Sequence, residues 1–171
     1  MTVINLGYTA QINREGQSVL TISQVWAGLE RKVRHAEEFV PLISACEVLE
    51  EQIAKENGND QQVEAITRNV TFRGNNGDPG RVVKEVCKLY PPCRVDFHQE
   101  DGSKIANYVT YGPSGEEQDL WMTYVFEWRH PDVQEGSDEA AALKVKHKTT
   151  AKMAVESSIE TIRRLVAEGK L

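Results

Sequence analysis

Residues 138–168, DEAAALKVKHKTTAKMAVESSIETIRRLVAE, form the longest periodic stretch of the chain and decide its fold. Ser137 or Asp138 can cap the start of a helix there, and Gly169 can end it. At about 1.5 Å per residue, such a helix is roughly 45 Å long, enough to cross a whole sheet. Its inward stripe recurs at helical spacing and consists of Leu143, His147, Thr150, Ala151, Ala154, Ser158, Ile162, Leu165 and Val166.

Seven stretches with strand character precede this helix. Apolar residues alternate with polar ones along them, and turn residues such as Asn, Asp and Gly separate them. Repeated strand–turn–strand spacing predicts an antiparallel meander. The expected strands are residues 3–13, 43–54, 62–73, 81–89, 94–99, 104–111 and 118–128.

Two short helices are expected between the first strand and the second. Thr21 and Gln24 have capping-box spacing ahead of an apolar stripe, and residues 36–40 form a second piece that Pro41 ends. This order predicts an α+β fold, in which a curved seven-stranded antiparallel sheet wraps on the long C-terminal helix. At 171 residues, we expect residues 1–171 to form one domain.

Composition excludes several classes of function. A formal net charge of −6, spread along the chain, argues against a nucleic-acid partner, because phosphate binding needs a basic face. No stretch approaches the roughly 20 apolar residues of a membrane span, and the start of the chain does not resemble a secretory signal. Cys46, Cys87 and Cys93 fit neither a disulfide framework nor a metal-ligand spacing. We therefore expect a cytoplasmic protein with no metal, cofactor or membrane partner.

Short stretches along the chain carry a family resemblance: QVWAGLERK at 24–32, TRNVTF at 67–72, KEV at 84–86, YPP at 90–92, IANYV at 105–109 and FEWR at 126–129. Together with the order of elements, they resemble the acetylaranotin-biosynthesis-cluster protein L family of the START-like helix-grip superfamily (SRPBCC). The resemblance covers nearly the whole chain. It implies a helix-grip fold and a small ligand-binding protein, in some members encoded in fungal secondary-metabolite clusters. The family brings no catalytic motif to carry over, so the site must be derived from the residues.

The first half of the long helix points to a cavity. Its inward stripe is rich in small residues, whereas the second half offers large ones, and small side chains facing a concave sheet leave space. The alternative is that small residues only allow close packing of the helix on the sheet. His147, Ala151 and Ala154 are the helix positions that we expect to contact a ligand.

Three polar residues lie on otherwise apolar strand faces. Arg68, Glu85 and Asn107 each stand between apolar neighbours at period two, and a buried charge is costly unless it is paired. Arg68 and Glu85 flank one predicted hairpin, so they can pair across adjacent strands. With Asn107 they would form a polar floor that orients a ligand. The alternatives are a structural ion pair, or a face that is turned to solvent.

His147 on the helix stripe is a candidate acid or base, since its reference pKa is about 6.5. If the protein is an enzyme, His147, Glu85 and Arg68 are the expected catalytic set. A lone His on an apolar stripe is more often a satisfied side chain. No second His completes a metal set.

Aromatic residues complete the predicted ligand contacts. Trp26 and Phe39 are expected at the entrance, because the resemblance places the helix pair there, and Tyr124 and Phe126 are expected along the cavity wall. The turns at 75–80 and 112–115 could serve as gates, although turn chemistry alone explains both.

These observations leave three functions open. The first is a carrier or accessory protein that binds a small apolar or polycyclic metabolite. The second is a cofactor-independent enzyme that uses the same cavity for a cyclisation, condensation or dehydration. The third is an interaction protein with a vestigial cavity. Dimers are common in such folds, so the resemblance also leaves a homodimer open.

Overall fold

A computed structural model describes residues 1–55, 62–74 and 80–171. Most of the expected turn at 75–80 lies outside these residues. The elements are β1 (Thr2–Gln11), α1 (Ile22–Arg34), the 3-10 helix η1 (Ala36–Glu38), β2 (Ile43–Lys55), β3 (Gln62–Phe72), β4 (Arg81–Tyr90), β5 (Arg94–Gln99), β6 (Lys104–Tyr111), β7 (Leu120–His130) and α2 (Asp138–Ala167).

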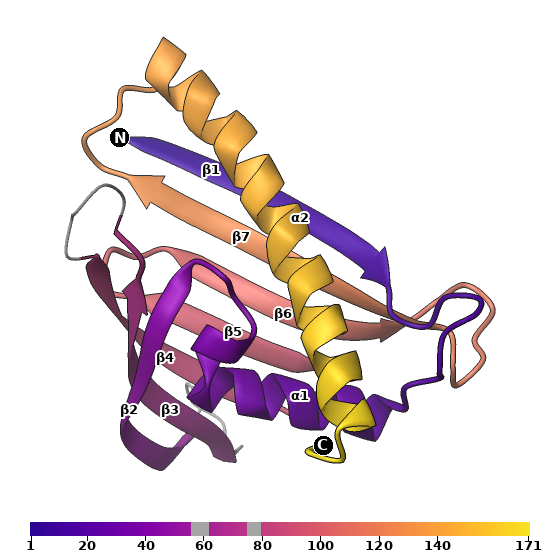
Figure 1. Ribbon diagram of the computed structural model, residues 1–171. Coiled ribbons are helices and arrows are strands. Elements are labelled where there is room, and N and C mark those ends of the chain that lie inside the picture. The colour runs from indigo at the N-terminus through magenta and orange to yellow at the C-terminus, as the bar shows by residue number, and fades with distance from the viewer. Residues whose placement is uncertain (56–61, 75–79) are drawn as a thin grey trace.

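The seven strands form one antiparallel sheet in the order β1-β7-β6-β5-β4-β3-β2. The run from β2 to β7 is the predicted meander, and β1 pairs with β7 so that the first strand lies beside the last (Figure 1). The structure thus confirms the α+β class, the seven-stranded sheet and the long C-terminal helix.

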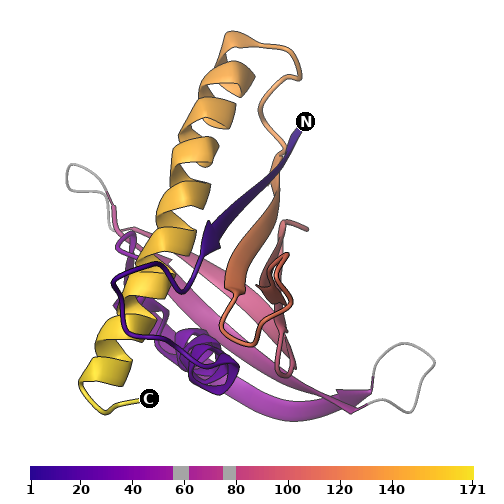
Figure 2. The same cartoon turned by 90° about the vertical axis from the view of Figure 1, so that its right-hand side faces the viewer.

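The helix α2 runs over β1 and β7 and ends beside α1 (Figures 1 and 2). Ser137 is its N-cap and accepts a hydrogen bond from the backbone N–H of Ala140 at 3.1 Å. Hydroxyls on its second half anchor it to η1 and the turn after η1, because Ser157 donates to the carbonyl of Phe39 and Thr161 to that of Glu38.

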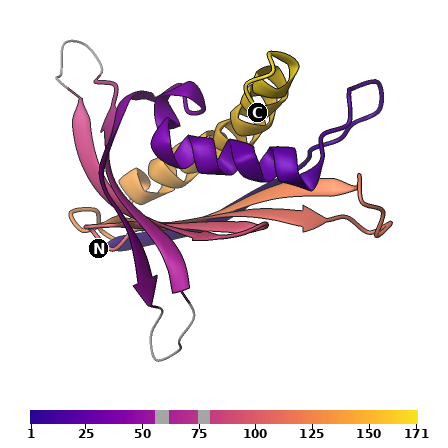
Figure 3. The same cartoon turned by 90° about the horizontal axis from the view of Figure 1, so that it is seen from below.

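The helix α1 lies on the concave side of the curved sheet and beside α2 (Figure 3). Its predicted capping box is confirmed: Thr21 accepts from the backbone of Gln24, and the Gln24 side chain accepts from the backbone of Thr21. Gly28 is where the two helices approach most tightly, since an added Cβ would overlap Cγ1 of the buried Ile162.

The sheet curves most where β2 and β3 wrap round α1 (Figure 3). Two register irregularities interrupt the pairing of β2 with β3, one between Ile43 and Ala45 and one between Val48 and Glu50. Such bulges bend a strand and increase its twist. The main core fills the space between this concave face, α1 and the second half of α2.

The two halves of α2 differ in burial. From residue 138 to 150, Ala140 is the one residue that is buried, while Leu143, His147 and Thr150 are half-buried. From 151 onward, the helix buries a continuous face. In the part of the chain that the structure describes, no helix is both long and apolar enough to cross a membrane.

Candidate functional site

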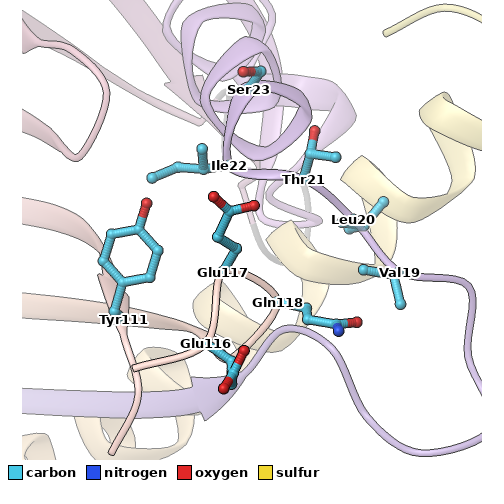
Figure 4. A pocket seen from close by; sticks show the side chains of 9 residues that line it. All are labelled: Val19, Leu20, Thr21, Ile22, Ser23, Tyr111, Glu116, Glu117 and Gln118. Carbon is cyan, nitrogen blue, oxygen red and sulfur yellow. The ribbon is translucent and has the colours of Figure 1, made fainter. Parts of the chain in front are cut away.

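Two hollows compete as the candidate site, and the larger is an outer groove at the start of α1 (Figure 4). It measures about 580 Å³ and lies between residues 19–23 and the β6–β7 connection. The carboxylate of Glu117 points towards the start of α1 there, and the α1 cap is already closed by Thr21 and Gln24. Among the described residues, none that line this groove has a buried polar atom without a partner. The groove therefore offers no unpaired group that a ligand would satisfy.

The second hollow, called the inner pocket below, lies between the concave face of the sheet, α1 and the middle of α2, which contributes Thr150 and Ala154. Its volume is about 120 Å³. Exposure falls along its wall, from Leu42 at 44% to Asn107 at 0%, so it opens near the η1–β2 connection and ends on β6. The lining residues are Lys32, Ala36, Val40, Leu42, Ile43, Arg68, Phe72, Glu85, Phe97, Gln99, Ile105, Asn107, Tyr124, Phe126, Trp128, Thr150 and Ala154.

Six of the predicted site residues line the inner pocket. They come from five elements that the sequence separates widely, and the sheet brings them to one concave face. They are Arg68, Glu85, Asn107, Tyr124, Phe126 and Ala154.

Four predicted residues lie elsewhere, which differs from the expectation. Trp26 and Phe39 are 8% and 1% exposed and belong to the main core, because α1 turns Trp26 inward instead of towards an entrance and Phe39, directly after η1, is buried in the same cluster. Ala151 is also buried in that core. His147 is outside the lining. The turn at 112–115 follows the far end of β6, away from the pocket mouth, so it does not gate this pocket.

Arg68 and Glu85 form the predicted pair. They are direct partners on β3 and β4, and Nε and Nη2 of Arg68 donate to one carboxylate oxygen of Glu85 at 2.9 and 2.6 Å. The other guanidinium nitrogen, Nη1, donates to the carbonyls of Lys32 and Val33 on α1. The side chain of Gln99 donates to the second oxygen of Glu85 at 2.8 Å. Both charges are 3% exposed and fully engaged with protein partners, as buried charges require.

Asn107 and Tyr124 contrast with this pair. They are direct partners on β6 and β7 and are 0% and 1% exposed. Among the described residues, the amide oxygen and nitrogen of Asn107 and the hydroxyl of Tyr124 have no hydrogen-bond partner. Burial raises the pKa of Tyr124 well above its ordinary value, and the nearby Ser158 offsets part of that shift.

Lys32 is the site residue that sequence reasoning missed. It lies three residues after Leu29 on the buried face of α1 and is 6% exposed. A signal did exist, because i and i+3 share a helix face, but a lysine in an apolar stripe is normally assigned to solvent. Burial, and then the charge of Arg68, lowers its pKa from 10.5 to about 7.

His147 belongs to a stack of rings beside the pocket. The ring of Phe126 stacks on Trp128 with centroids 4.4 Å apart, and Trp128 stacks on His147 at 4.0 Å. Nε2 of His147 lies 2.8 Å from Nε2 of His130. Burial, followed by the charges of His130 and Lys146, lowers the pKa of His147 to about 4. His147 touches the pocket through Trp128, and no contact in the described chain joins it to Arg68 or Glu85.

Other reactive groups are not assembled into a site. Burial raises the pKa of the Cys87 thiol to about 12, so it behaves as a small buried apolar group. Within residues 1–55, 62–74 and 80–171, no cluster of three His, Cys, Asp or Glu side chains could hold a metal ion.

Comparison with known proteins agrees with the motifs. Residues 6–169 match the family described as acetylaranotin biosynthesis cluster protein L. A curated protein of that name from Aspergillus terreus is 27% identical over 168 residues, which cover 98% of this chain and 92% of that protein.

Solved structures share the fold at low sequence identity. The di-domain ARO/CYC StfQ from the steffimycin biosynthetic pathway superposes with a TM-score of 0.61 at 10% identity, over 96% of this chain and 52% of that one. This chain thus spans about half of that di-domain protein. The AHSA1-like protein from Aeromonas hydrophila gives a TM-score of 0.51 at 12% identity, over 98% and 96% of the two chains. These likenesses establish the helix-grip fold.

Proposed function

The chain belongs to the acetylaranotin biosynthesis cluster protein L family, and from that membership we propose that it binds a small, largely apolar metabolite in the inner pocket. It would act there as a carrier or accessory protein. The family match supports a role in secondary-metabolite biosynthesis. The ligand site itself is our inference from the pocket.

The observation that carries this proposal is the side chain of Asn107. Its two polar atoms are buried in a pocket with mostly apolar walls and have no partner in the described chain. Leaving a buried polar group unpaired costs about 1–3 kcal/mol. A ligand carbonyl would accept from the amide N–H and a ligand hydroxyl would also be able to donate to the amide oxygen, while the apolar part of the ligand would contact Phe97, Phe126 and Trp128.

The size of the pocket limits the ligand. At about 120 Å³, it is smaller than the roughly 300 Å³ at which drug-sized pockets begin. It suits a compact molecule such as a single substituted ring. A polycyclic metabolite would require the first half of α2, which has little buried surface, to shift away from the sheet.

The contacts favour a carrier over the enzyme that the sequence suggested. Arg68 and Glu85 are held by each other and by backbone and amide partners. His147 lies outside the lining. These three side chains therefore do not converge on one reacting atom, which acid–base catalysis needs.

The test is calorimetric titration of the protein with benzyl alcohol, a single ring with one hydroxyl. The variant Asn107→Leu removes the polar group of the pocket at nearly constant shape. Thr110→Val is the matched control, because Thr110 is an exposed residue of the same strand. We expect wild type and T110V to bind with equal affinity, and N107L to bind about tenfold more weakly, as expected for loss of one good hydrogen bond.

Equal binding by all three proteins would place the alcohol outside the inner pocket and contradict the proposal. So would the absence of binding heat for wild type with benzyl alcohol, phenol and benzaldehyde alike.

A further inference from the structure

The inner pocket contains a buried amine. Lys32 reaches it from α1 and is 6% exposed. Lysine is almost never buried to this extent unless it is paired. A buried lysine without a carboxylate partner therefore calls for an explanation.

Aromatic rings, instead of a carboxylate, surround the amine. Nζ of Lys32 lies 4.1 Å from the ring centroid of Tyr124 and 5.6 Å from that of Phe97. It joins no ion pair and donates no hydrogen bond within the described chain. The nearby carboxylate of Glu85 is occupied by Arg68 and Gln99.

The charges around Lys32 come from three strands. Arg68 on β3 disfavours a second positive charge, whereas Glu85 and Cys87 on β4 favour it, and the ring of Tyr124 on β7 also favours the cation. Burial and Arg68 dominate and lower the pKa to about 7. Close to half of the Lys32 side chains are then free amines near neutral pH.

We propose that Lys32 is a nucleophilic amine that forms an imine with an aldehyde or ketone carbonyl of the bound metabolite. This inference rests on the proposed function, since it uses the same pocket. Desolvation in an apolar pocket and a neighbouring cation are the two arrangements that activate a lysine for this chemistry.

The reaction balances without a further reagent. The lone pair of Nζ attacks the carbonyl carbon, a C–N bond forms, and the carbonyl π electrons move to oxygen. A proton passes from nitrogen to that oxygen to give a carbinolamine. The nitrogen lone pair then expels hydroxide to leave an iminium, and hydroxide takes the remaining N–H proton and leaves as water. One amine and one carbonyl thus give one imine and one water.

The polar end of the pocket suits a carbonyl compound. Asn107 and Tyr124 stand side by side on β6 and β7, and both have unpartnered donors. Either can donate to the oxygen as negative charge develops on it, which is the arrangement that stabilises such an oxyanion. The lining also offers apolar surface for the rest of the molecule.

The test is reductive trapping of the full chain with benzaldehyde and sodium cyanoborohydride, followed by peptide mass mapping. Cyanoborohydride delivers hydride to the imine and leaves a stable secondary amine on the labelled lysine. Near pH 7, an amine with a pKa of about 7 carries far more free base than an ordinary lysine, so we expect Lys32 to be labelled about a hundredfold faster than the exposed Lys152. Lys32→Met should lose that label, and Lys152→Met should keep it.

Benzyl alcohol separates this proposal from the proposed function, because it has the same ring without a carbonyl. Binding of the alcohol by wild type and K32M, with labelling confined to exposed lysines, would overturn the imine and leave the binding function intact. Loss of both alcohol binding and Lys32 labelling in wild type would overturn both.

A pH series on wild type needs no variant. The labelling rate of Lys32 should reach half its maximum near pH 7, whereas that of Lys152 should still rise beyond pH 9. Parallel profiles for the two lysines would contradict the proposal.

Discussion

Two polar sets share the concave face of the sheet, and they differ in how their atoms are partnered. Arg68 and Glu85 use each other, two backbone carbonyls and Gln99. Asn107 and Tyr124 are equally buried but have unpartnered polar atoms. Since the two sets have the same burial, partnering alone separates a structural role from a ligand-facing one.

Substitutions in the two sets should therefore change the unfolding free energy in opposite directions. Removing one member of a fully partnered set leaves the charge of the other buried without a partner, which destabilises the fold. Removing an unsatisfied polar group relieves a cost that the fold already carries. The variants below measure this difference in sign.

The largest effect is expected for Glu85→Gln. It leaves the guanidinium of Arg68 buried without an opposite charge, and we expect a loss of about 3–5 kcal/mol in unfolding free energy. Urea denaturation followed by circular dichroism measures it. Glu127→Gln is the control, because Glu127 pairs with Arg129 at 2.6 Å but both are partly exposed. That control should lose less than about 1 kcal/mol in unfolding free energy. Equal losses for the two variants would contradict the structural role of the Arg68–Glu85 pair.

The next effect is a pH dependence caused by Lys32. Burial and Arg68 lower its pKa from 10.5 to about 7, so between these values the unfolded chain binds the extra proton. Stability contributed by Lys32 therefore rises with pH in that window, by at most about 1.4 kcal/mol per pH unit. Below pH 7 the contribution is flat.

Comparison of wild type with Lys32→Met isolates this contribution, because other groups titrate alike in both. The difference in unfolding free energy between the two proteins should shift in favour of wild type from about pH 7 to about pH 9. A constant difference across that range would show that Lys32 has an ordinary pKa and is not buried as described.

A smaller effect of opposite sign is expected for Asn107→Leu. The substitution removes two buried polar atoms without partners, and we expect a gain of about 1–2 kcal/mol in unfolding free energy without ligand. Thr110→Val should change stability by less than about 0.5 kcal/mol. A destabilised N107L protein would mean that the amide has partners in solution, and Asn107 would then join the structural set.

The smallest effect is expected for Tyr124→Phe, because Ser158 lies near the hydroxyl and reduces the cost of burying it. A gain of about 0.5 kcal/mol is expected. Tyr8→Phe is the contrasting variant, since the hydroxyl of Tyr8 donates to Glu156 at 2.9 Å. It should lose stability instead. Thermal unfolding of both variants in one buffer measures the contrast, and the same sign for both would contradict it.

Local periodicity was enough to predict most of the fold. The period of two along the strands and of 3.6 along residues 138–168 depends only on neighbouring residues, so element types and order are correct. The observed ends of a strand differ from the predicted ones where pairing with a neighbouring strand determines them. The last strand continues to His130 because Thr2 of β1 pairs with it, and it starts at Leu120 because Asp119 is held by Ser114 and Trp121.

The site was less predictable, because it depends on distances across the fold. The pairing of Arg68 with Glu85 followed from a single hairpin and is confirmed. Trp26 went to the core because α1 packs its apolar face inward, and Phe39 because α2 holds the end of η1 through Ser157 and Thr161; no local pattern reveals either contact. Lys32 was missed for the same reason: a pattern shows its helix face but not the pocket opposite.

The pairing of β1 with β7 affects how the chain can fold while it is being synthesised. Residues 2–11 have their hydrogen-bond partners at 121–130, so β1 cannot pair in this sheet until β7 has been translated. Until then, both edges of β1 are unpaired, and unpaired strand edges are the kind of surface that attracts other strands. Contacts so distant in sequence also form slowly, so β1 stays in this state longer than the strands of the meander.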